Sequence, residues 1–521
     1  MDRLARSALI LGLTALVSIC ACRKETVAPV TAPEPPPSPV APPPPPPKTI
    51  VPEEGGEGTF ALEEPFTGLS ATKLATSSDR ILRGLAFRGL TRLDPSGNVE
   101  PELAERWEML RGGAEWVLHL RPDTRFANGR YVEARHVVSS WEKLISDPTA
   151  RYAWLLESIR GFGETSPGGA QHVPGLVLED GLTLRVVFTR PVRDLLFRLA
   201  HPALGVSAFG EDEQGVGPFE IWGAPQPQQV VVRGNPEYFR GLPHLDEIAF
   251  VRGEAARAGR IASGSLDGAV LAAGEDAPSG ASVRVFTHSV PRTYVLGLNR
   301  STDPFSRPET ARAFLASLDR EALRRAAAGE RGSIPATLVA ALAPGRKAAD
   351  LPEKAPDPPA SLGRLDLLIP DSDKAAGLLA GKIQAEVLGA GGRVMIHAVK
   401  QADLSAALAR REYHLFIRPF VPSTPHLLLS YEEMMQWNRS IPGSLMAQAR
   451  ALEGEEAPAA LPAALEPLDA SLQLGGYLFP LVSLERRLLA GRGTCGLRPD
   501  PVGMLDWTQV WKSRTPGGEC E

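Results

Sequence analysis

The sequence predicts an α/β protein made of more than one domain. At 521 residues the chain is too long for a single hydrophobic core. Its hydrophobic content of 43% and its charged content of 22% are ordinary for a globular protein. From residue 365 onwards, segments with the period of a strand alternate with segments with the period of a helix, which is how α/β sheets are built.

The first residues have the layout of a secretory signal. A basic start precedes an apolar run at 8–19, which is too short to span a membrane comfortably. The run ends in Ile-Cys-Ala-Cys, which is similar to a bacterial lipobox with a small residue just before Cys22. We therefore expect 1–22 to be a lipoprotein signal peptide that ends at a lipidated Cys22. The alternative is an ordinary cleaved signal with an incidental cysteine.

Residues 23–58 have little to bury. Proline, alanine, valine and glutamate dominate, with six consecutive prolines at 42–47. Over 27–52 this composition favours extended polyproline II, and 53–58 is expected to be a flexible junction. We therefore expect 23–58 to be a proline-rich tether, stiff over 27–52, between the anchor and the folded protein.

The stretch from 89 to 144 carries several local signals in order. A turn at Asp94-Pro95-Ser96-Gly97 precedes a short helix expected at 101–107. Apolar residues then alternate at 116–120, which predicts a half-buried strand. Helical spacing of apolar residues at 137–144 predicts a helix whose apolar stripe packs on that strand.

Further along, turn and periodicity signals predict a hairpin and a second set of strands and helices. Glu179-Asp180-Gly181 separates two apolar runs, as in a β-hairpin. A strand is expected at 293–299. Ser306 to Glu309 has the form of a capping box that opens a helix, and Asp319 opens the next helix.

The last part of the chain predicts strand, helix, strand, helix, strand. The expected strands lie at 365–369, 394–398 and 413–417. The first intervening helix is expected at 375–387, and Asp403 is expected to cap the second.

Several of these stretches are similar to sequence motifs of one protein family. The signature "GLTRLDPSGNVEPELAERWE" is joined in the same order by "GVGPF", "NPEYF", "LDEI", "DREAL" and "GLRPDPVG". Together they resemble the family 5 extracellular solute-binding proteins, the peptide, nickel and oligosaccharide receptors of ABC importers. The resemblance implies a two-lobed periplasmic-binding-protein fold of type II, with three domains as in peptide receptors and with mixed sheets.

The resemblance also implies how the chain is divided among three domains. Domain I would be assembled from 59–84, 207–291 and 491–521. Domain II would be 85–206, and domain III would be 292–490.

No catalytic or cofactor-binding constellation is present in the sequence. Glycine-rich stretches lack the spacing of a P-loop or of a dinucleotide-binding turn, and no histidine pairs with another histidine or a cysteine at metal-ligand spacing. A net charge of -5 argues against nucleic acid as a partner. We therefore predict that the protein is not an enzyme and uses no cofactor, no metal and no nucleic acid.

Two segments would line the ligand cleft by resemblance. The first is 289–299, which includes Arg292, Thr293 and Tyr294 and whose backbone in peptide-binding relatives pairs with the peptide as an added strand. The second is the loop 418–425, which contains Arg418, Phe420 and Val421. In peptide receptors an aspartate of this loop holds the α-ammonium group of the ligand.

Val421 stands where that aspartate is expected. A valine does not offset the desolvation of a buried ammonium group, and Arg418 would repel one, so an anionic or neutral polar group is favoured over a free peptide N-terminus. The alternative for Arg418 is a surface arginine without a ligand. Phe420 and Tyr294 are aromatic candidates for the cleft wall, or are part of the core.

Two further cysteines lie near the C-terminus. In an exported protein, Cys495 and Cys520 meet an oxidising compartment, which favours a disulfide between them. The alternative is two unpaired thiols.

Taken with the resemblance, these features predict a lipid-anchored substrate-binding protein of an ABC importer that closes two lobes over a peptide-like or other small polar solute. We expect a monomer in the bacterial cell envelope, facing the periplasm or exterior, with a permease complex as partner and the lipid anchor as its sole membrane contact. The alternative is a family-derived envelope lipoprotein that acts as a sensor or interaction protein without transport. The valine at 421, a trimmed segment at 341–363 and the long tether favour it.

Overall fold

The structure is a computed structural model. It describes residues 51–64, 66–164, 172–208, 214–226, 228–252, 257–271, 283–287, 291–340, 342, 362–454 and 460–514. The expected signal peptide, Cys22, residues 23–50 of the expected tether, most of the segment 341–363 and Cys520 lie outside the described residues. The expected end of the tether at 58 is too late, because a strand begins at Glu57. Within the described ranges, no helix is both long and apolar enough to cross a membrane.

A seven-stranded mixed sheet has β1 (Glu57–Leu62) at its centre, where β1 runs parallel to both of its neighbours. The strand order is β12-β19-β11-β1-β10-β9-β8. The other strands are β8 (Phe219–Gln226), β9 (Gln229–Gly234), β10 (Glu247–Arg252), β11 (Gly268–Val270), β12 (Val283–Thr287) and β19 (Arg487–Gly491). Side chains along a strand point alternately to opposite faces of the sheet. Phe60 of β1, Val232 of β9 and Phe250 of β10 are buried together in one core.

Helix α1 (Ser77–Ala86) packs on this sheet through Leu82 and Leu85. Its first turn is closed by a capping box in which Thr76 accepts a hydrogen bond from the backbone of Asp79 and the Asp79 side chain bonds back. Helix α4 (Arg257–Ala262) packs on β19 and β11. The short strands β20 (Thr494–Cys495) and β21 (Trp511–Lys512) pair with each other near the end of the described chain.

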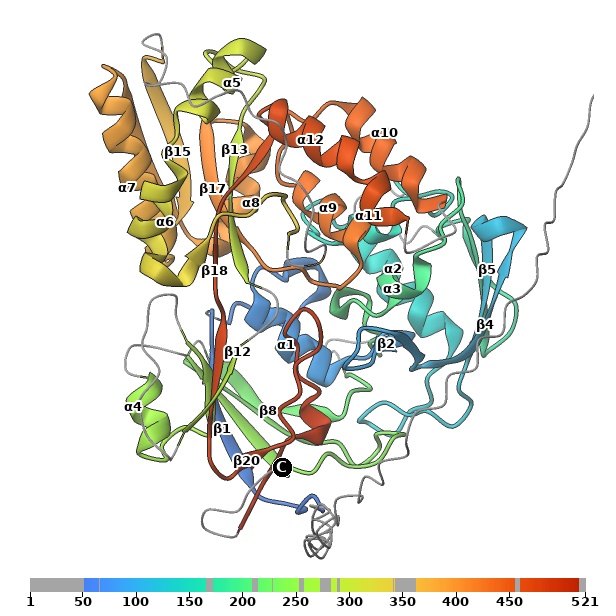
Figure 1. Cartoon of the computed structure of the whole chain (residues 1–521). Helices are drawn as coiled ribbons and strands as arrows, with labels where there is room; N and C mark the ends of the chain where they lie inside the picture. The colour runs from blue at the N-terminus through green and yellow to red at the C-terminus, as the bar shows by residue number, and fades with distance from the viewer. Residues whose placement is uncertain are drawn as a thin grey trace, which may run out of the picture. The chain divides into compact units, whose positions relative to one another are not determined.

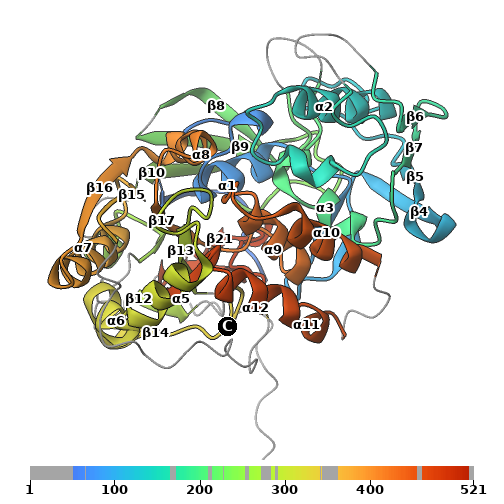
Figure 2. The same ribbon diagram turned by 90° about the horizontal axis from the view of Figure 1, so that it is seen from above.

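A four-stranded antiparallel sheet contains the predicted hairpin. Its order is β4 (Ala104–Leu110), β5 (Glu115–Leu120), β7 (Thr183–Val187) and β6 (Leu176–Leu178). Figure 2 shows these strands beside α2 (Ala134–Ser146). The apolar stripe of α2 shares a core with Trp116 and Leu118 of β5, as the sequence predicts. Helix α3 (Leu195–Leu199) follows, and β2 (Thr91–Leu93) pairs with β3 (Val99–Pro101) across the predicted turn.

The expectation of a helix at 101–107 is wrong. Residues 104–110 form β4, which pairs antiparallel with β5 over its whole length. The backbone hydrogen bonds offered by β5 outweigh the helix-forming tendency of this alanine- and glutamate-containing stretch, because β5 would otherwise leave that edge unpaired.

A six-stranded sheet has the order β14-β18-β13-β17-β15-β16. Its strands are β13 (Arg292–Leu298), β14 (Gly332–Ser333), β15 (Arg364–Pro370), β16 (Arg393–Val399), β17 (Leu415–Phe420) and β18 (Leu478–Leu484). Helices cover both faces, so β13 is buried on each side. Tyr294 and Leu296 contribute to the core on one face, and Val295 contributes to the core on the other.

Figure 1 shows the helices on the two faces of this sheet. On one side lie α5 (Pro308–Ser317), α6 (Arg320–Ala328) and α7 (Lys374–Gly389). The other face is covered by α8 (Gln401–Arg410), α9 (Leu427–Met435), α10 (Gly443–Ala451), α11 (Leu461–Ala464) and α12 (Glu466–Leu474). The predicted alternation of strands and helices from 365 to 417 is therefore confirmed.

The sequence predicted where helices occur better than it predicted the residues at which they begin. Asp319 caps α6 as expected, by accepting a hydrogen bond from the backbone of Ala322. At α5 the N-cap is Arg307, which makes no side-chain cap, so the expected capping box is wrong although proline does occupy the first turn. Asp403 lies inside the first turn of α8 and does not cap it. Shifts of this kind, by one residue at α5 and by three at α8, depend on local backbone angles that composition does not set.

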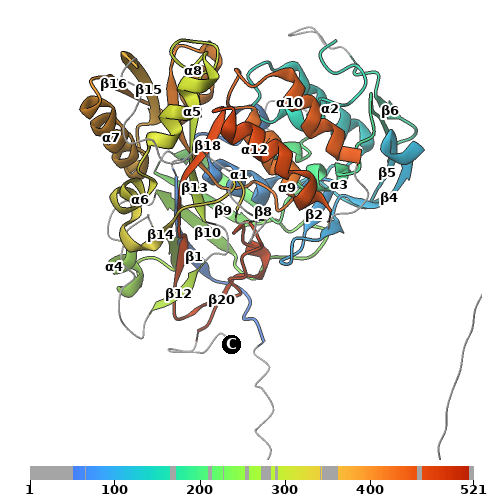
Figure 3. The same cartoon turned by 45° about the horizontal axis from the view of Figure 1, so that its top comes forward.

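The chain passes between the six-stranded and seven-stranded sheets at two adjacent places. β12 leads toward β13, and β18 leads into β19. Arg292 pairs with Leu484 in one sheet, and Thr287 pairs with Arg487 in the other, so the two crossings run side by side. Figure 3 shows β13 and β18 together above β12 and β1.

The three sheets draw on separate parts of the chain. The strands of the seven-stranded sheet come from 57–62, 219–287 and 487–491, those of the four-stranded sheet from 104–187, and those of the six-stranded sheet from 292–484. The division into three domains stays a prediction. β19 begins before 491, where we placed the last boundary.

Cys495 is completely buried against Trp511 and is disulfide-bonded. Because Cys520 lies outside the described residues, its pairing with Cys495 stays a prediction.

Candidate functional site

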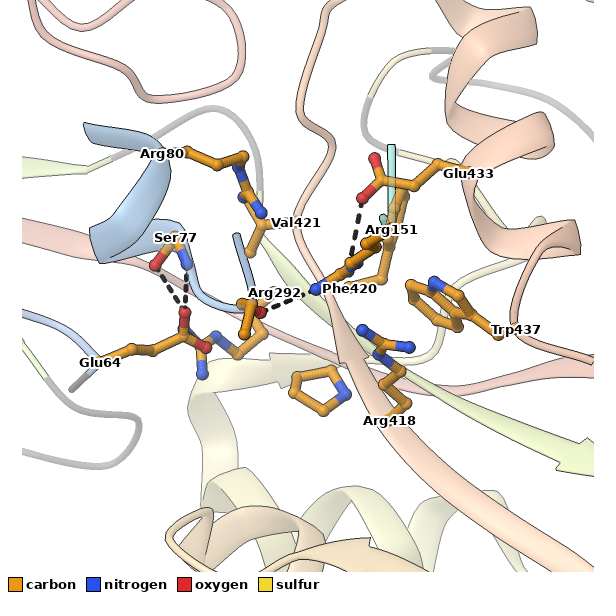
Figure 4. Close-up of a pocket in the computed structure, with 12 residues that line it drawn as sticks. Glu64, Ser77, Arg80, Arg151, Arg292, Arg418, Phe420, Val421, Glu433 and Trp437 are labelled. Atoms are coloured by element: carbon orange, nitrogen blue, oxygen red, sulfur yellow. Dashed lines mark hydrogen bonds and ion pairs between the residues drawn. The ribbon is translucent and has the colours of Figure 1, made fainter. Parts of the chain in front are cut away.

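A cavity lies where segments from the three parts of the chain meet. Its volume is about 30 Å³, enough for about two water molecules. It is lined by Glu64, Ala75, Ser77, Arg80, Arg151, Arg292, Arg418, Pro419, Phe420, Val421, Glu433 and Trp437 (Figure 4). Four arginines and two glutamates give this lining a formal charge of four minus two, or +2.

Arg292 is compensated by carboxylates. Its Nη2 lies 2.5 Å from Oε1 of Glu63 and 3.7 Å from Oε1 of Glu64, and its Nη1 lies 3.6 Å from Oδ2 of Asp373. Burial alone would lower the pKa of Arg292, but these carboxylates raise it well above the usual value. Arg292 thus lines the cavity with its charge already neutralised.

Arg151 and Arg80 interact with oxygen atoms of neighbouring residues. Arg151 donates from Nη1 to the carbonyl oxygen of Ala75 at 2.7 Å, and its Nη2 lies 3.6 Å from Oε1 of Glu433. Arg80 donates from Nη1 to the hydroxyl oxygen of Tyr152 at 3.1 Å.

Arg418, on β17, differs from the other three. Its side chain is only 2% exposed, yet it makes no hydrogen bond and no ion pair with any residue that the structure describes. Its guanidinium carbon lies 4.3 Å from the ring centre of Trp437, and Figure 4 shows no bond drawn to it. Burial, followed by repulsion from Arg151, lowers the pKa of Arg418 well below the usual value.

The two carboxylates in the lining are engaged elsewhere. Glu64 accepts hydrogen bonds from the backbone nitrogen and the hydroxyl of Ser77, at 2.6 and 2.7 Å. Glu433 accepts from the hydroxyl of Ser423 at 2.7 Å, in addition to its ion pair with Arg151. The cavity is therefore suited to a negatively charged group.

Four of the six candidate ligand residues from the sequence line this cavity, namely Arg292, Arg418, Phe420 and Val421. Thr293 and Tyr294 are not among the lining residues. The Thr293 hydroxyl bonds to the Ser483 hydroxyl at 2.8 Å, and the Tyr294 hydroxyl donates to Asp373 at 3.0 Å. The reading of Arg418 as a surface arginine is wrong, because the side chain is buried.

The expected pairing of a peptide backbone with β13 is also not available here. β17 pairs with one edge of β13 over Thr293–Leu298, and β18 pairs with the other over Arg292–Gly297. An interior strand has its donors and acceptors occupied by its neighbours, so it offers no free edge for strand addition.

The sequence did not identify several lining residues. Arg80 lies on α1, Arg151 follows α2, Glu433 lies on α9, and Trp437 follows α9. A buried arginine or glutamate on an amphipathic helix carries no local signature, because its spacing is that of any helical residue.

A second cavity of about 140 Å³ shares Arg80 with the first. It lies between α1, β2, Ser423 and the segment 498–507. Asp500 in its wall is largely buried, and burial raises its pKa to about 6 even though backbone N–H groups of Met504 and Val502 hydrogen-bond to it.

Over the ranges that the structure describes, no group of three or more histidine, cysteine, aspartate or glutamate side chains is placed to hold a metal ion.

Comparison with known proteins places this fold and sequence in one family. A sequence profile of the bacterial extracellular solute-binding proteins, family 5 Middle, matches residues 98–384, more than half of the chain. Di/tripeptide-binding protein 4 of Pseudomonas aeruginosa is 28% identical over 207 residues, which cover 36% of this chain and 37% of that protein. The matched stretch thus spans little more than a third of that relative.

Solved structures match over nearly the whole chain. The PBP AgaA from A. tumefaciens R10, in complex with agropinic acid, has a TM-score of 0.75 at 20% identity, covering 89% of this chain and 100% of that one. The murein tripeptide binding protein MppA of Escherichia coli has a TM-score of 0.73 at 16% identity, with the same coverage. At these identities the likeness establishes the fold, and it confirms the two-lobed periplasmic-binding-protein fold with mixed sheets. The chain belongs to family 5 of the bacterial extracellular solute-binding proteins.

Proposed function

We propose that this protein is the substrate-binding component of an ABC importer and closes its two lobes over a small polar solute. The observation that carries the proposal is the convergence of all three sheet-bearing parts of the chain on one cavity, where Arg418 is buried with no hydrogen-bond or ion-pair partner among the described residues. Family membership supports it, as does the relative named for binding di- and tripeptides. Closure over a ligand is a hinge motion, and two adjacent crossings are suited to serve as the hinge.

Binding without chemistry is part of this proposal. The lining contains no histidine, cysteine or lysine, and its one serine, Ser77, donates its hydroxyl hydrogen to Glu64 at 2.7 Å. The hydroxyl of Ser77 donates to a glutamate that Arg292 also approaches, so that glutamate is occupied as an acceptor.

The envelope location rests on the sequence of the first 58 residues. With Cys22 lipidated, the segment 27–52 in polyproline II would reach roughly 80 Å, at about 3.1 Å per residue. A monomer on such a tether can meet a permease complex in the membrane plane. Palmitate labelling followed by mass spectrometry tests the anchor, and Cys22→Ala should release the protein from the membrane fraction.

Solute binding is tested by thermal unfolding of the full-length protein against peptides, N-blocked peptides, organic acids, opines, oligosaccharides and metal chelates. A solute present at about 100 times its Kd should stabilise the fold by about 2.7 kcal/mol, seen as a rise of a few degrees in Tm. A flat response to every class would count against a solute-binding protein.

Transport needs a separate test. Deleting the gene in the source bacterium should abolish uptake of the solute found by unfolding, and the wild-type gene should restore uptake. Normal uptake in the deletion strain would contradict the importer role while leaving solute binding intact.

One observation favours the second candidate, an envelope sensor or interaction protein. The cavity of about 30 Å³ is far smaller than the roughly 300–1,000 Å³ of most ligand sites. Solute binding with unchanged uptake would support this second candidate, and loss of uptake on deletion would exclude it.

A further inference from the structure

We propose that the solute bound by this protein is a small organic anion, and that its carboxylate pairs with the guanidinium of Arg418. This inference rests on the proposed solute-binding function and adds the chemical class of the solute. It depends on the charge balance of the cavity, which the structure describes residue by residue.

A buried charge without a counter-charge is costly, because it has lost its hydration and gained nothing in return. Arg418 is 2% exposed and has no hydrogen-bond or ion-pair partner among the described residues. Buried polar groups in folded proteins nearly always have partners, so an exception calls for an explanation. A partner that arrives with the ligand is such an explanation.

The protein around Arg418 does not supply that partner. The nearest carboxylates in the lining, Glu64 and Glu433, are bonded to Ser77, Ser423 and Arg151. Trp437 lies 4.3 Å from the guanidinium carbon and offers its ring, which attracts a cation through its face. A ring contact leaves N–H groups of the guanidinium free to donate two parallel hydrogen bonds to a carboxylate.

The other residues of the lining also favour a negatively charged ligand. Arg80 has no carboxylate within ion-pair distance among the described residues. With Arg292 already paired with Glu63, the lining still holds three other arginines against two glutamates. Val421 offers no acceptor to an ammonium group. A free amino group placed beside Arg418 would therefore meet repulsion and no compensating oxygen.

The cavity volume bears on how the anion enters. About 30 Å³ accommodates a carboxylate group but not a whole organic acid. Because residues from all three parts of the chain line the cavity, the remainder of the ligand needs these parts to move apart before it is enclosed.

The test is calorimetric titration of the full-length protein with pairs of compounds that differ in one carboxylate. Suitable pairs are N-acetylalanine with N-acetylalaninamide, and butyrate with butyramide. The acids should bind and the amides should not. In Arg418→Met the affinity for the acids should fall roughly 10- to 100-fold, because a charge-assisted bidentate contact is lost.

Two further variants sharpen this test. Arg418→Lys keeps the charge but loses the planar fork, so its affinity should lie between those of the wild type and Arg418→Met. Arg410→Met removes the same charge from an exposed position on α8, and it should bind the acids as the wild type does. An equal loss in Arg410→Met would mean that net charge, rather than the cavity, governs binding.

The ligand-free protein gives an independent readout. Because Arg418 is an unpaired buried charge, Arg418→Met should raise the Tm of the ligand-free protein while weakening ligand binding. An arginine with a purely structural role would behave in the opposite way, with a lower Tm on substitution. A lower Tm therefore overturns the inference.

The outcomes also separate this inference from the function on which it rests. If neutral solutes bind equally to the wild type and to Arg418→Met, the solute-binding function is supported and the proposal of an anionic solute is contradicted. If inorganic phosphate or sulfate binds through Arg418 and no organic acid does, the proposal that Arg418 pairs with a carboxylate is contradicted. If no compound of any class binds at millimolar concentration, both proposals fail.

Discussion

The carboxylate of Glu63 accepts a hydrogen bond from Arg486, with 3.0 Å between Oε2 and Nη2, at the point where the chain crosses from β18 to β19. The same carboxylate lies 2.5 Å from Nη2 of Arg292, at the start of β13 on the other crossing. A single residue at the end of β1 thus ties together both crossings between the two large sheets. This triad is buried, with side-chain exposures of 9–13%.

Replacing Glu63 by glutamine should destabilise the protein in a pH-dependent way. Burial alone would raise the pKa of Glu63, but Arg292 and Arg486 outweigh burial and lower it to about 2. A depressed carboxyl pKa contributes stability that is present above about pH 4.5 and is lost as pH falls toward 2. Glu63→Gln should therefore cost about 3 kcal/mol of unfolding free energy near pH 7 and much less near pH 3.

Urea unfolding at the two pH values measures this difference, with the exposed Glu108→Gln as the control. Equal destabilisation by Glu63→Gln at both pH values would show that the charge of Glu63 is not what holds the two arginines.

A second buried charge network joins the end of α3 to α9 and the segment after α10. Arg198 lies 3.0 Å from Asp194, 2.9 Å from Glu432 and 3.1 Å from Glu453. Burial raises the pKa of Glu432 to about 7, although Arg198 partly opposes this. A raised carboxyl pKa contributes stability that is complete below about pH 4.5 and is lost as pH rises through 7.

The stability of the wild type relative to Glu432→Gln should therefore fall between about pH 5 and pH 8, because glutamine stays neutral throughout. Taking the difference cancels the effects of the other titrating groups. Measured Tm curves that run parallel for the two proteins would contradict a raised pKa at Glu432.

Arg450 and Glu157 form a bidentate ion pair at the rim of this network. Nε lies 3.0 Å from Oε1, and Nη2 lies 2.8 Å from Oε2. Because Arg450 is 38% exposed, solvent screens the pair and a coupling energy of about 0.5–1 kcal/mol is expected. A double-mutant cycle with Glu157→Gln and Arg450→Met measures it, and strictly additive effects would show that the pair contributes nothing.

Gly297 lies in β13 against the ring of Phe416. A Cβ atom at this position would come within 2.0 Å of the Phe416 ring, so Gly297→Ala should cost about 3 kcal/mol through overpacking. Gly381→Ala is the matched control, because that exposed helical glycine has no atom near its missing Cβ, and alanine there should stabilise α7 slightly. Urea unfolding compares the two, and a cost below about 1 kcal/mol for Gly297→Ala would mean that Phe416 moves aside easily.

The sequence predicted those elements whose signal is local. The stripe of α2, the hairpin of β6 and β7, and the alternation from β15 to β17 follow from spacings within about 20 residues. The helix expected at 101–107 failed because β5, a partner outside that stretch, decided its conformation. Family membership was also readable from the sequence, since its motifs recur in a fixed order.

For the candidate site, the sequence identified Arg418, Phe420 and Val421 as a segment and identified the missing aspartate. It misjudged the strand around Tyr294, because which edges of a strand are occupied depends on strands from 415–420 and 478–484. It also gave no sign of Arg80, Arg151, Glu433 or Trp437.

The amino-acid sequence by itself determined the periodic elements, the order of the family motifs and the valine at 421 where the resemblance leads us to expect an aspartate. The tertiary structure alone decided that Arg418 is buried with no ion-pair partner among the described residues, while Arg292 is paired with Glu63. The physical reason is that periodicity is a property of neighbouring residues, whereas charge compensation depends on groups brought together from distant parts of the chain.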